Sequence, residues 1–227
     1  PVGLDNCAGP LTTFTSGLAP GATFPIGITT NSFLVVDAAG NSATCAFTVT
    51  INDTELPIIT CPASLSVSAS LGVCAAPVSF TTPVGTDNCS GQLTVQNAGL
   101  VSGAMFPVGT TTNAYTVTDA SGNTATCAFT ITVVDTQLPT ITCPASLSMS
   151  AGVGVCDAVV TFTAPVGSDN CPLATTTQTA GLGSGATFPI GTTTNSYTVT
   201  DASGNSATCA FTVTVNDTEL PTISCPA

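Results

Sequence analysis

Cationic side chains are missing from this sequence: its 227 residues include no Lys, no Arg and no His. Its 12 acidic residues give a formal net charge of −12 at pH 7. Proteins bind nucleic acids and anionic membrane surfaces through Lys and Arg, which this chain does not have. We therefore predict no nucleic-acid partner and no attraction to anionic membranes.

Long apolar runs are missing as well. No apolar stretch approaches the roughly 18 residues of a membrane-spanning helix, so we predict no membrane insertion in this region. Apolar residues alternate with Thr and Ser instead, which is the pattern of strands with one buried face. Trp is absent and aromatic residues make up only 5% of the chain. Cores with so few aromatic side chains are expected to need disulfides.

The main feature that is present is an internal repeat. The stretch 115–145 recurs almost unchanged at 197–227, and a variant of it occupies 33–63. The period is 82 residues, as the recurrence of one cysteine at Cys45, Cys127 and Cys209 shows. A fixed period of this length indicates an array of like modules. The predicted modules are a partial one at 1–53, complete ones at 57–135 and 139–217, and the start of another at 221–227.

Each module is predicted to be all-β. About seven short strands with alternating apolar residues in each module are typical of an immunoglobulin-like β-sandwich. The strands expected in the middle module are Ile58–Cys61, Leu65–Val67, Val73–Thr82, one around Leu93 and Val95, one or two within 99–109, Thr111–Thr118 and Thr124–Val134. The large core residues expected are Phe80, Phe106, Tyr115 and Phe129, with Phe162, Phe188, Tyr197 and Phe211 as their equivalents.

Short linkers separate the predicted modules. Residues 54–56 and 136–138 are each followed by Pro, which favours an extended backbone in the residue before it. Three residues are too few for a flexible tether. Successive modules are therefore expected to sit end to end and to form a stiff rod.

Eleven cysteines point to an oxidising compartment and to structural disulfides. Zinc is the competing interpretation, but the chain has no Cys-x-x-Cys pair and no His to ligate it. Each complete module carries four cysteines, which permit three different pairings. In the middle module they are Cys61, Cys74, Cys89 and Cys127.

Several motifs occur in a constant order in each module. They are Pro139-x-Ile141-x-Cys143-Pro144, Asp87-Asn88, Phe106-Pro107-x-Gly109, Tyr115-x-Val117-x-Asp119-x-x-Gly122-Asn123 and Ala125-x-Cys127-x-Phe129-x-Ile131-x-Val133. In this order the chain resembles the hyalin repeat (HYR) domains of extracellular and cell-surface proteins. The resemblance implies an immunoglobulin-like fold, a secreted or cell-surface location, a role in adhesion or extracellular matrix, and no catalytic residues.

The resemblance also bears on the disulfides. Family members with only two cysteines keep the positions of Cys61 and Cys127, and the first and last strands of such a fold can lie side by side. The pairs expected on this basis are Cys61–Cys127, Cys143–Cys209, Cys74–Cys89 and Cys156–Cys171, with partners outside this region for Cys7, Cys45 and Cys225. Two alternatives stay open, namely Cys61–Cys74 with Cys89–Cys127, and a bond between modules such as Cys45–Cys61.

Acidic residues recur before an Asn, at the start of the last hairpin loop and at the module ends. These places are expected to meet at one end of each sandwich, where Ca²⁺ would find the carboxylate and carbonyl oxygens that it prefers. The candidate Ca²⁺ ligands are Asp53, Glu55, Asp87, Asp119, Asp135, Asp169 and Asp201. The alternative is turn chemistry, in which Asp and Asn bond to their own backbone. Asn52, Asn88 and Asn216 fit the acceptor pattern for N-glycosylation.

No enzyme is expected, because only carboxylates are present as catalytic bases and they recur in every module. The leading hypothesis is a stiff, disulfide-stabilised stalk or fibre segment of a large secreted or cell-surface protein. Its partners would be neighbouring repeats of the chain and like chains in a filament. The alternative is an adhesin-type module that contacts carbohydrate or protein through its loops, which vary most at 7–18, 89–100 and 171–182.

Overall fold

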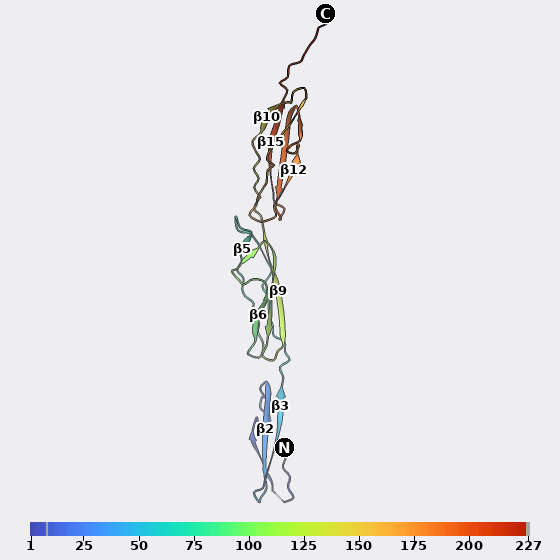
Figure 1. The fold of residues 1–227 in the computed structure, drawn as a ribbon. Helices are drawn as coiled ribbons and strands as arrows, with labels where there is room; N and C mark the ends of the chain where they lie inside the picture. Colours follow the sequence, from blue (N-terminus) through green and yellow to red (C-terminus); the bar gives the residue numbers. More distant parts are fainter. Residues whose placement is uncertain (8, 226–227) are drawn as a thin grey trace. The chain divides into compact units, whose positions relative to one another are not determined.

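The computed structural model describes residues 1–7 and 9–225, and the regular elements within these residues are strands (Figure 1). Two residues of the predicted fourth module, 226–227, lie outside the described residues. The chain divides into two compact units. Unit 1 comprises Pro1–Cys61, Pro83–Asn97 and Ala114–Cys127, and unit 2 comprises Pro62–Thr82, Ala98–Asn113 and the chain from Ala128 onward.

The third repeat lies within unit 2 and is a sandwich of two sheets. Its strands are β10 (Leu147–Ser150), β11 (Asp157–Val159), β12 (Thr175–Ala180), β13 (Thr187–Pro189), β14 (Gly191–Thr200) and β15 (Ser206–Asn216). One sheet has the order β10-β15-β14-β12, and the other pairs β11 with β13. β10 runs parallel to β15, whereas the other pairs are antiparallel. The chain therefore enters and leaves this repeat at opposite ends.

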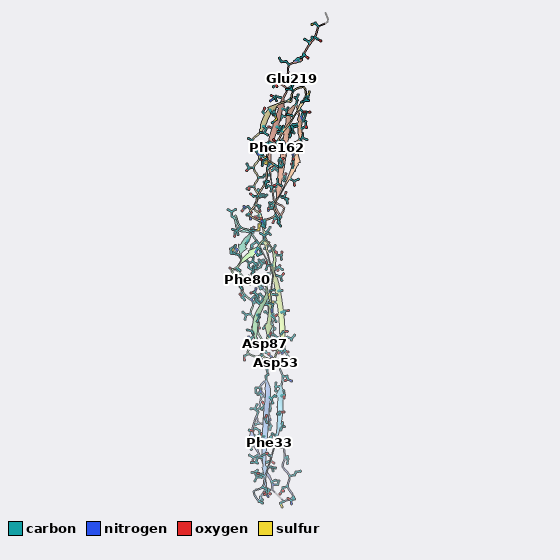
Figure 2. All side chains as sticks on the ribbon, viewed as in Figure 1. Phe33, Asp53, Phe80, Asp87, Phe162 and Glu219 are labelled. Atoms are coloured by element: carbon teal, nitrogen blue, oxygen red, sulfur yellow. A yellow bond between two sulfur atoms is a disulfide. The ribbon has the colours of Figure 1, made fainter. Side chains whose placement is uncertain are left out.

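Strict alternation along β14 and β15 sends one side chain in two into the core. The buried cluster consists of Val160, Phe188, Tyr197, Phe211, Val213 and Val215. Phe162 is half-buried at the edge of this cluster, with its ring centroid 5.0 Å from that of Phe211 (Figure 2). The four aromatic residues predicted for this core therefore lie in the buried cluster or at its edge. Val213 and Val215 are aliphatic members of the same cluster.

A buried amide ties the loop after β12 to β14. Asn195 is completely buried, and its Oδ1 accepts a hydrogen bond of 2.7 Å from the N–H of Leu182. Gly181 next to it has a φ of 87°, a conformation that side-chain-bearing residues rarely adopt. A Cβ at Gly181 would also collide with Asn195 Oδ1. The loop can close over Asn195 only with glycine at this position.

We expect Gly181→Ala to destabilise the third repeat by about 2 kcal/mol or more, because both the positive φ and the collision oppose it. The matched control is Gly183→Ala, since nothing lies within 4 Å of a Cβ there and its φ is not positive. Urea unfolding of both variants measures the difference. Equal midpoints for the two variants would contradict this account of Gly181.

The middle repeat has the same strand plan. Its strands are β4 (Leu65–Ser68), β5 (Ala75–Pro77), β6 (Leu93–Ala98), β7 (Met105–Pro107), β8 (Gly109–Thr118) and β9 (Thr124–Val134). They form a sheet of order β4-β9-β8-β6 and a pair of β5 with β7. Phe106, Tyr115 and Phe129 are buried, as predicted, and Phe80 is half-buried. The prediction of an all-β, immunoglobulin-like fold is confirmed.

Two predicted strands of the middle repeat are wrong in extent. The expected strand Val73–Thr82 is regular only over β5, and Ile58–Cys61 contributes a single bridge between Ile58 and Thr86. Beyond β5 the side chain of Ser102 replaces a backbone partner: Phe80 N–H donates to Ser102 Oγ (2.8 Å), and this hydroxyl donates to Phe80 O (2.7 Å). The backbone of Phe80 is therefore hydrogen-bonded, but not in the regular pattern of a β-sheet.

The first repeat, in unit 1, is a single three-stranded sheet. Its strands are β1 (Leu11–Ser16), β2 (Gly27–Val36) and β3 (Ser42–Ile51), in the order β1-β2-β3. Residues 23–25, which correspond to β7, form no strand, since a partner like β5 is lacking among the described residues. Phe14 and Phe47 consequently remain 38% and 45% exposed, and each of their rings contacts that of Phe33.

Candidate functional site

Two disulfides close the sandwiches in the way the sequence predicts. Cys61 is bonded to Cys127 and Cys143 to Cys209, each with a Cα–Cα distance of 5.6 Å. In each pair the first cysteine precedes the first strand of the repeat, and the second lies in the last strand. The parallel pairing of these strands brings the two cysteines together.

The other predicted pairs, Cys74–Cys89 and Cys156–Cys171, are wrong. Cys74 of the middle repeat is bonded instead to Cys171 of the third repeat, with a Cα–Cα distance of 4.9 Å. Cys89 and Cys156 carry free thiols, as do Cys7, Cys45 and Cys225.

The third repeat shows why its second and third cysteines do not pair. Cys156 lies where the chain leaves the repeat, because Gly154 N–H donates to Glu219 Oε2 of the following linker (2.9 Å). Cys171 lies where the chain enters, grouped with Asp135. The two cysteines of one repeat are thus at opposite ends of the sandwich.

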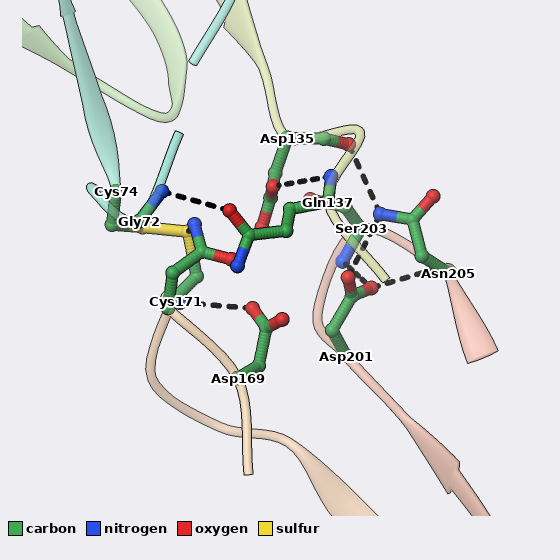
Figure 3. Close-up of a disulfide and its surroundings, with 10 residues drawn as sticks. Gly72, Cys74, Asp135, Gln137, Asp169, Cys171, Asp201, Ser203 and Asn205 are labelled. Carbon is green, nitrogen blue, oxygen red and sulfur yellow. Dashed lines mark hydrogen bonds between the residues drawn. A yellow bond between two sulfur atoms is a disulfide. The ribbon is translucent and has the colours of Figure 1, made fainter. Parts of the chain in front are cut away.

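Hydrogen bonds surround the disulfide that joins the repeats (Figure 3). Gly72 N–H donates to Oε1 of the linker residue Gln137 (2.8 Å), and Cys171 N–H donates to Asp169 Oδ2 (2.9 Å). On the other side of the linker, Asn205 Nδ2 donates to the backbone oxygen of Asp135 (3.1 Å). The linker is therefore bonded both to the loop before it and to the hairpin after it.

Asp201 organises the hairpin loop between β14 and β15. Its Oδ1 accepts the N–H groups of Ser203 (2.9 Å) and Asn205 (2.8 Å), and its Oδ2 accepts Asn205 Nδ2 (2.8 Å). Asp119 makes the same contacts with Ser121 and Asn123 in the middle repeat. Both carboxylates are used by their own loops, as the turn-chemistry alternative expects.

The hydrogen bonds of this loop make its stability depend on pH. Burial raises the pKa of Asp201, but hydrogen bonds from the side chain and backbone of Asn205 and from the backbone of Ser203 and Gly204 outweigh it, so the pKa lies below its ordinary value of 3.8. A lowered pKa in the folded state stabilises the fold above pH 3.8, and this contribution is lost as pH falls further.

We expect the third repeat of the variant Asp201→Asn to lose less stability below pH 3.8 than that of the parent chain, because the titrating carboxylate is gone. Urea unfolding of the full chain at a series of pH values from about 5 to about 2 measures this slope. The parent chain is the control, and parallel pH profiles of the two proteins would refute the assignment.

Asp135 and Asp169 form a pair of carboxylates beside the inter-repeat disulfide. Asp135 is only 3% exposed; its Oδ1 accepts Gln137 N–H (3.1 Å), whereas its Oδ2 is buried without a hydrogen-bond partner. A carboxylate oxygen of each residue and the sulfur of Cys171 lie within 4.8 Å of one another. Because this sulfur is in a disulfide, only the carboxylates are available to a cation.

An equivalent group in unit 1 contains Asp53, Asp87 and Cys89. Here the cysteine is a free thiol, and burial, a hydrogen bond to Asp53 and the charges of Asp53, Asp87 and Asp119 raise its pKa. Glu55, the other predicted ligand, accepts a hydrogen bond from Asn88 Nδ2 (2.8 Å) instead of joining the group.

The predicted glycosylation sites lie at the surface. Asn52, Asn88 and Asn216 are all exposed. The amide of Asn88 donates to Glu55 and that of Asn216 donates to Ser148 Oγ (3.1 Å), so two of the three amide nitrogens already have partners. Glycosylation at these positions stays a prediction, and the intact mass of the native protein would test it.

No helix in the described part of the chain has the length and apolar character needed to cross a bilayer.

The fold and the disulfide between the second and third repeats define the class of protein: tandem β-sandwich repeats that are cross-linked by disulfides. The sequence model of the HYR domain matches residues 2–51, 52–133 and 134–215, and the chain belongs to this family. The predicted resemblance is confirmed.

Relatives of this chain include two proteins named hyalin. It is 40% identical over 215 residues to hyalin from Strongylocentrotus purpuratus, which covers 91% of this chain and 18% of that protein. It is 35% identical to hyalin from Lytechinus variegatus, covering 91% of this chain and 40% of the relative. The serine-rich adhesin for platelets of Staphylococcus aureus (strain N315) is 32% identical over 206 residues, 80% of this chain and 8% of the adhesin. The chain thus spans less than half the length of these relatives.

Cadherin repeats are among the solved structures that match this chain. The structure of the protocadherin gammaB7 EC3-6 cis-dimer matches with a TM-score of 0.39 and 15% sequence identity, over 93% of this chain and 68% of that one.

Proposed function

We propose that this region is a stiff spacer of a larger secreted or cell-surface protein with a role in adhesion or matrix, and that it carries out no catalysis. The disulfide Cys74–Cys171 is the observation that carries this proposal. The oxidising environment that such bonds need supports a location outside the cytosol. The name of the staphylococcal relative, an adhesin, fits the same setting.

Stiffness follows from the number of connections across one junction. A linker alone leaves neighbouring repeats free to bend, but the second and third repeats are also joined by the disulfide Cys74–Cys171. The hydrogen bond from Gly72 N–H to Gln137 fixes the linker itself against the second repeat. Because the disulfide lies apart from the linker backbone, a covalent bond opposes any bending that moves Cys74 away from Cys171.

The experiment compares the full chain with Cys74→Ser/Cys171→Ser by electron microscopy and small-angle X-ray scattering. We expect the double variant to show a broader distribution of lengths than the parent chain, since the hinge between the second and third repeats is released. The single variant Cys156→Ser removes an exposed free thiol and is the matched control. Equally broad distributions for the parent and the double variant would refute the spacer.

The alternative function, an adhesin-type module, makes a different prediction. It requires saturable binding of carbohydrate or protein by the loops at 89–100 or 171–182, which the spacer does not need. Binding to glycans or matrix proteins that survives removal of the Cys74–Cys171 bond would favour the adhesin. Association of like chains into filaments is compatible with the spacer and would appear in the same micrographs.

We also propose that Asp135 and Asp169 bind Ca²⁺ at the junction, with Asp53 and Asp87 as the equivalent pair. Two carboxylates with oxygens within 4.8 Å match two Ca²⁺–oxygen bonds of about 2.4 Å each. The buried Oδ2 of Asp135 has no hydrogen-bond partner, and a cation would satisfy it. Asp119 and Asp201 are not included, because their own loops use both oxygens.

We expect Ca²⁺ to raise the melting temperature of the full chain and EDTA to lower it, because a ligand that binds only the folded state stabilises it. At 100 times the dissociation constant the gain is about 2.7 kcal/mol per site. Asp169→Asn should reduce the response by about half, since the pair in unit 1 is left intact. A midpoint that is the same in Ca²⁺ and in EDTA would exclude the cation.

A further inference from the structure

The bond between Cys74 and Cys171 joins two kinds of loop that recur in the chain. One kind ends in Gly-Val-Cys, at 72–74 and again at 154–156. The other contains Asp-Asn-Cys, at 5–7, 87–89 and 169–171. The first loop of one repeat is bonded to the second loop of the next repeat. Cys156 is a free member of the first kind, and Cys7 and Cys89 are free members of the second.

The loop of Cys156 has the conformation of its bonded equivalent. Gly72 and Gly154 share a φ of 73°. The carbonyl of Cys74 accepts Val108 N–H (3.2 Å), and that of Cys156 accepts Ile190 N–H (3.1 Å). The loop is therefore already shaped for a bond, although Cys156 is exposed.

The linker next to Cys156 is also docked in the same way. Gly154 N–H donates to Glu219 Oε2 (2.9 Å), as Gly72 N–H donates to Gln137 Oε1 (2.8 Å). An open surface hollow beside Cys156 is lined by residues of the loop and of this linker, including Gly154, Asp217 and Leu220. The exposure of the two equivalent cysteines differs: Cys74, whose bond is made, is half-buried, whereas Cys156 is exposed.

The loop of Cys89 is the other half of such a junction. Its N–H donates to Asp87 Oδ2 (2.9 Å), as Cys171 N–H donates to Asp169 Oδ2 (2.9 Å). Its sulfur is grouped with Asp53 and Asp87, as the sulfur of Cys171 is with Asp135 and Asp169. Both free loops thus repeat the contacts of the bonded loops within their own repeats.

We propose that Cys156 and Cys89 are binding sites for further HYR repeats, and that each forms a disulfide like Cys74–Cys171. Cys156 would bond to the cysteine in the Asp-Asn-Cys loop of a following repeat. Cys89 would bond to the cysteine in the Gly-Val-Cys loop of a preceding repeat. The bond forms when each thiol gives up one proton and one electron. The two electrons and two protons convert oxidised glutathione, or a protein disulfide of an oxidoreductase, into two thiols.

The inference deepens the spacer proposal and rests on it for its role, because bonds at every junction would form a continuous covalent ladder. It is tested separately by mapping bonds rather than measuring lengths. The test chain keeps residues 1–227 and continues after Ala227 with a second copy of residues 146–227. This join keeps the period, since 225–227 and 143–145 have the same sequence, Cys-Pro-Ala.

After oxidation by a glutathione redox pair, peptic peptides are analysed by mass spectrometry without reduction. We expect Cys156 linked to the copied Cys171, with Cys74–Cys171 retained and Cys89 still alkylated by iodoacetamide. In the variant Cys156→Ser, the copied Cys171 should become a free thiol while the other bonds are kept. An intact bond Cys61–Cys127 shows that the variant chain still folds. A link between Cys156 and the Cys171 of its own repeat, or a Cys156 that stays alkylated, would overturn the proposal.

Discussion

Replacing Cys143 and Cys209 together by Ala is expected to lower the free energy of unfolding of the third repeat by about 4 kcal/mol. The two residues are 66 apart in the sequence, and a cross-link that closes a loop of this length removes much of the entropy of the unfolded chain. The small core makes the loss serious, because about 4 kcal/mol is a large share of the stability of a module of this size. Hydrogen exchange of β14 and β15 in the full chain measures it.

The matched control is the double replacement Cys61→Ala/Cys127→Ala, the equivalent bond of the middle repeat. It should leave exchange in β14 and β15 nearly unchanged while it accelerates exchange in β8 and β9. If both double variants affect the two repeats alike, the repeats unfold as one cooperative unit and the bond does not act locally. If neither changes exchange, the bond is not the main support of the sandwich.

Phe188→Ala is expected to destabilise the third repeat by 3 kcal/mol or more, within the roughly 3–5 kcal/mol typical of such core truncations. Phe188 is completely buried in β13, the short strand that covers the core from the second sheet. Removing its ring leaves a cavity between the two sheets and takes away the edge-to-face contact with Phe162 at 6.4 Å. The measurement is urea unfolding of the full chain, followed by exchange in β14.

Val159→Ala in the partner strand β11 is the control, because Val159 is 67% exposed and its truncation opens no cavity. Its effect should be within about 0.5 kcal/mol. Similar losses for Val159→Ala and Phe188→Ala would mean that the second sheet contributes little packing and that the four-stranded sheet is stable by itself.

The long strands were predictable because they alternate over their whole length. β9 covers the predicted Thr124–Val134, and β8 extends the predicted Thr111–Thr118 by two residues at its start. The early end of β5 was not predictable, because beyond it the hydrogen bonds of Phe80 are made with the hydroxyl of Ser102, a contact between residues 22 positions apart. No local pattern reports such a side-chain bond.

The disulfide between repeats could not be read from the sequence for a different reason. Cys89 and Cys171 have nearly the same neighbours, since the chain is periodic. Local sequence therefore cannot tell whether Cys74 pairs within its repeat or with the next one. The distinction depends on which end of the sandwich each loop occupies. The motifs did predict the carboxylate pair of Asp135 and Asp169, because each acid falls at the same place in every module.

The bond Cys143–Cys209 governs how this repeat responds to force. Cys143 precedes β10 and Cys209 lies in β15, so the bond joins the segment that enters the repeat directly to its last strand. Tension applied at the two termini of the repeat therefore passes through sulfur into β15, and the residues enclosed by the bond, β10 among them, cannot be drawn out. Without the bond, the same tension would load the hydrogen bonds between Leu147–Ser150 and Val213–Asn216 in shear, because these strands are parallel.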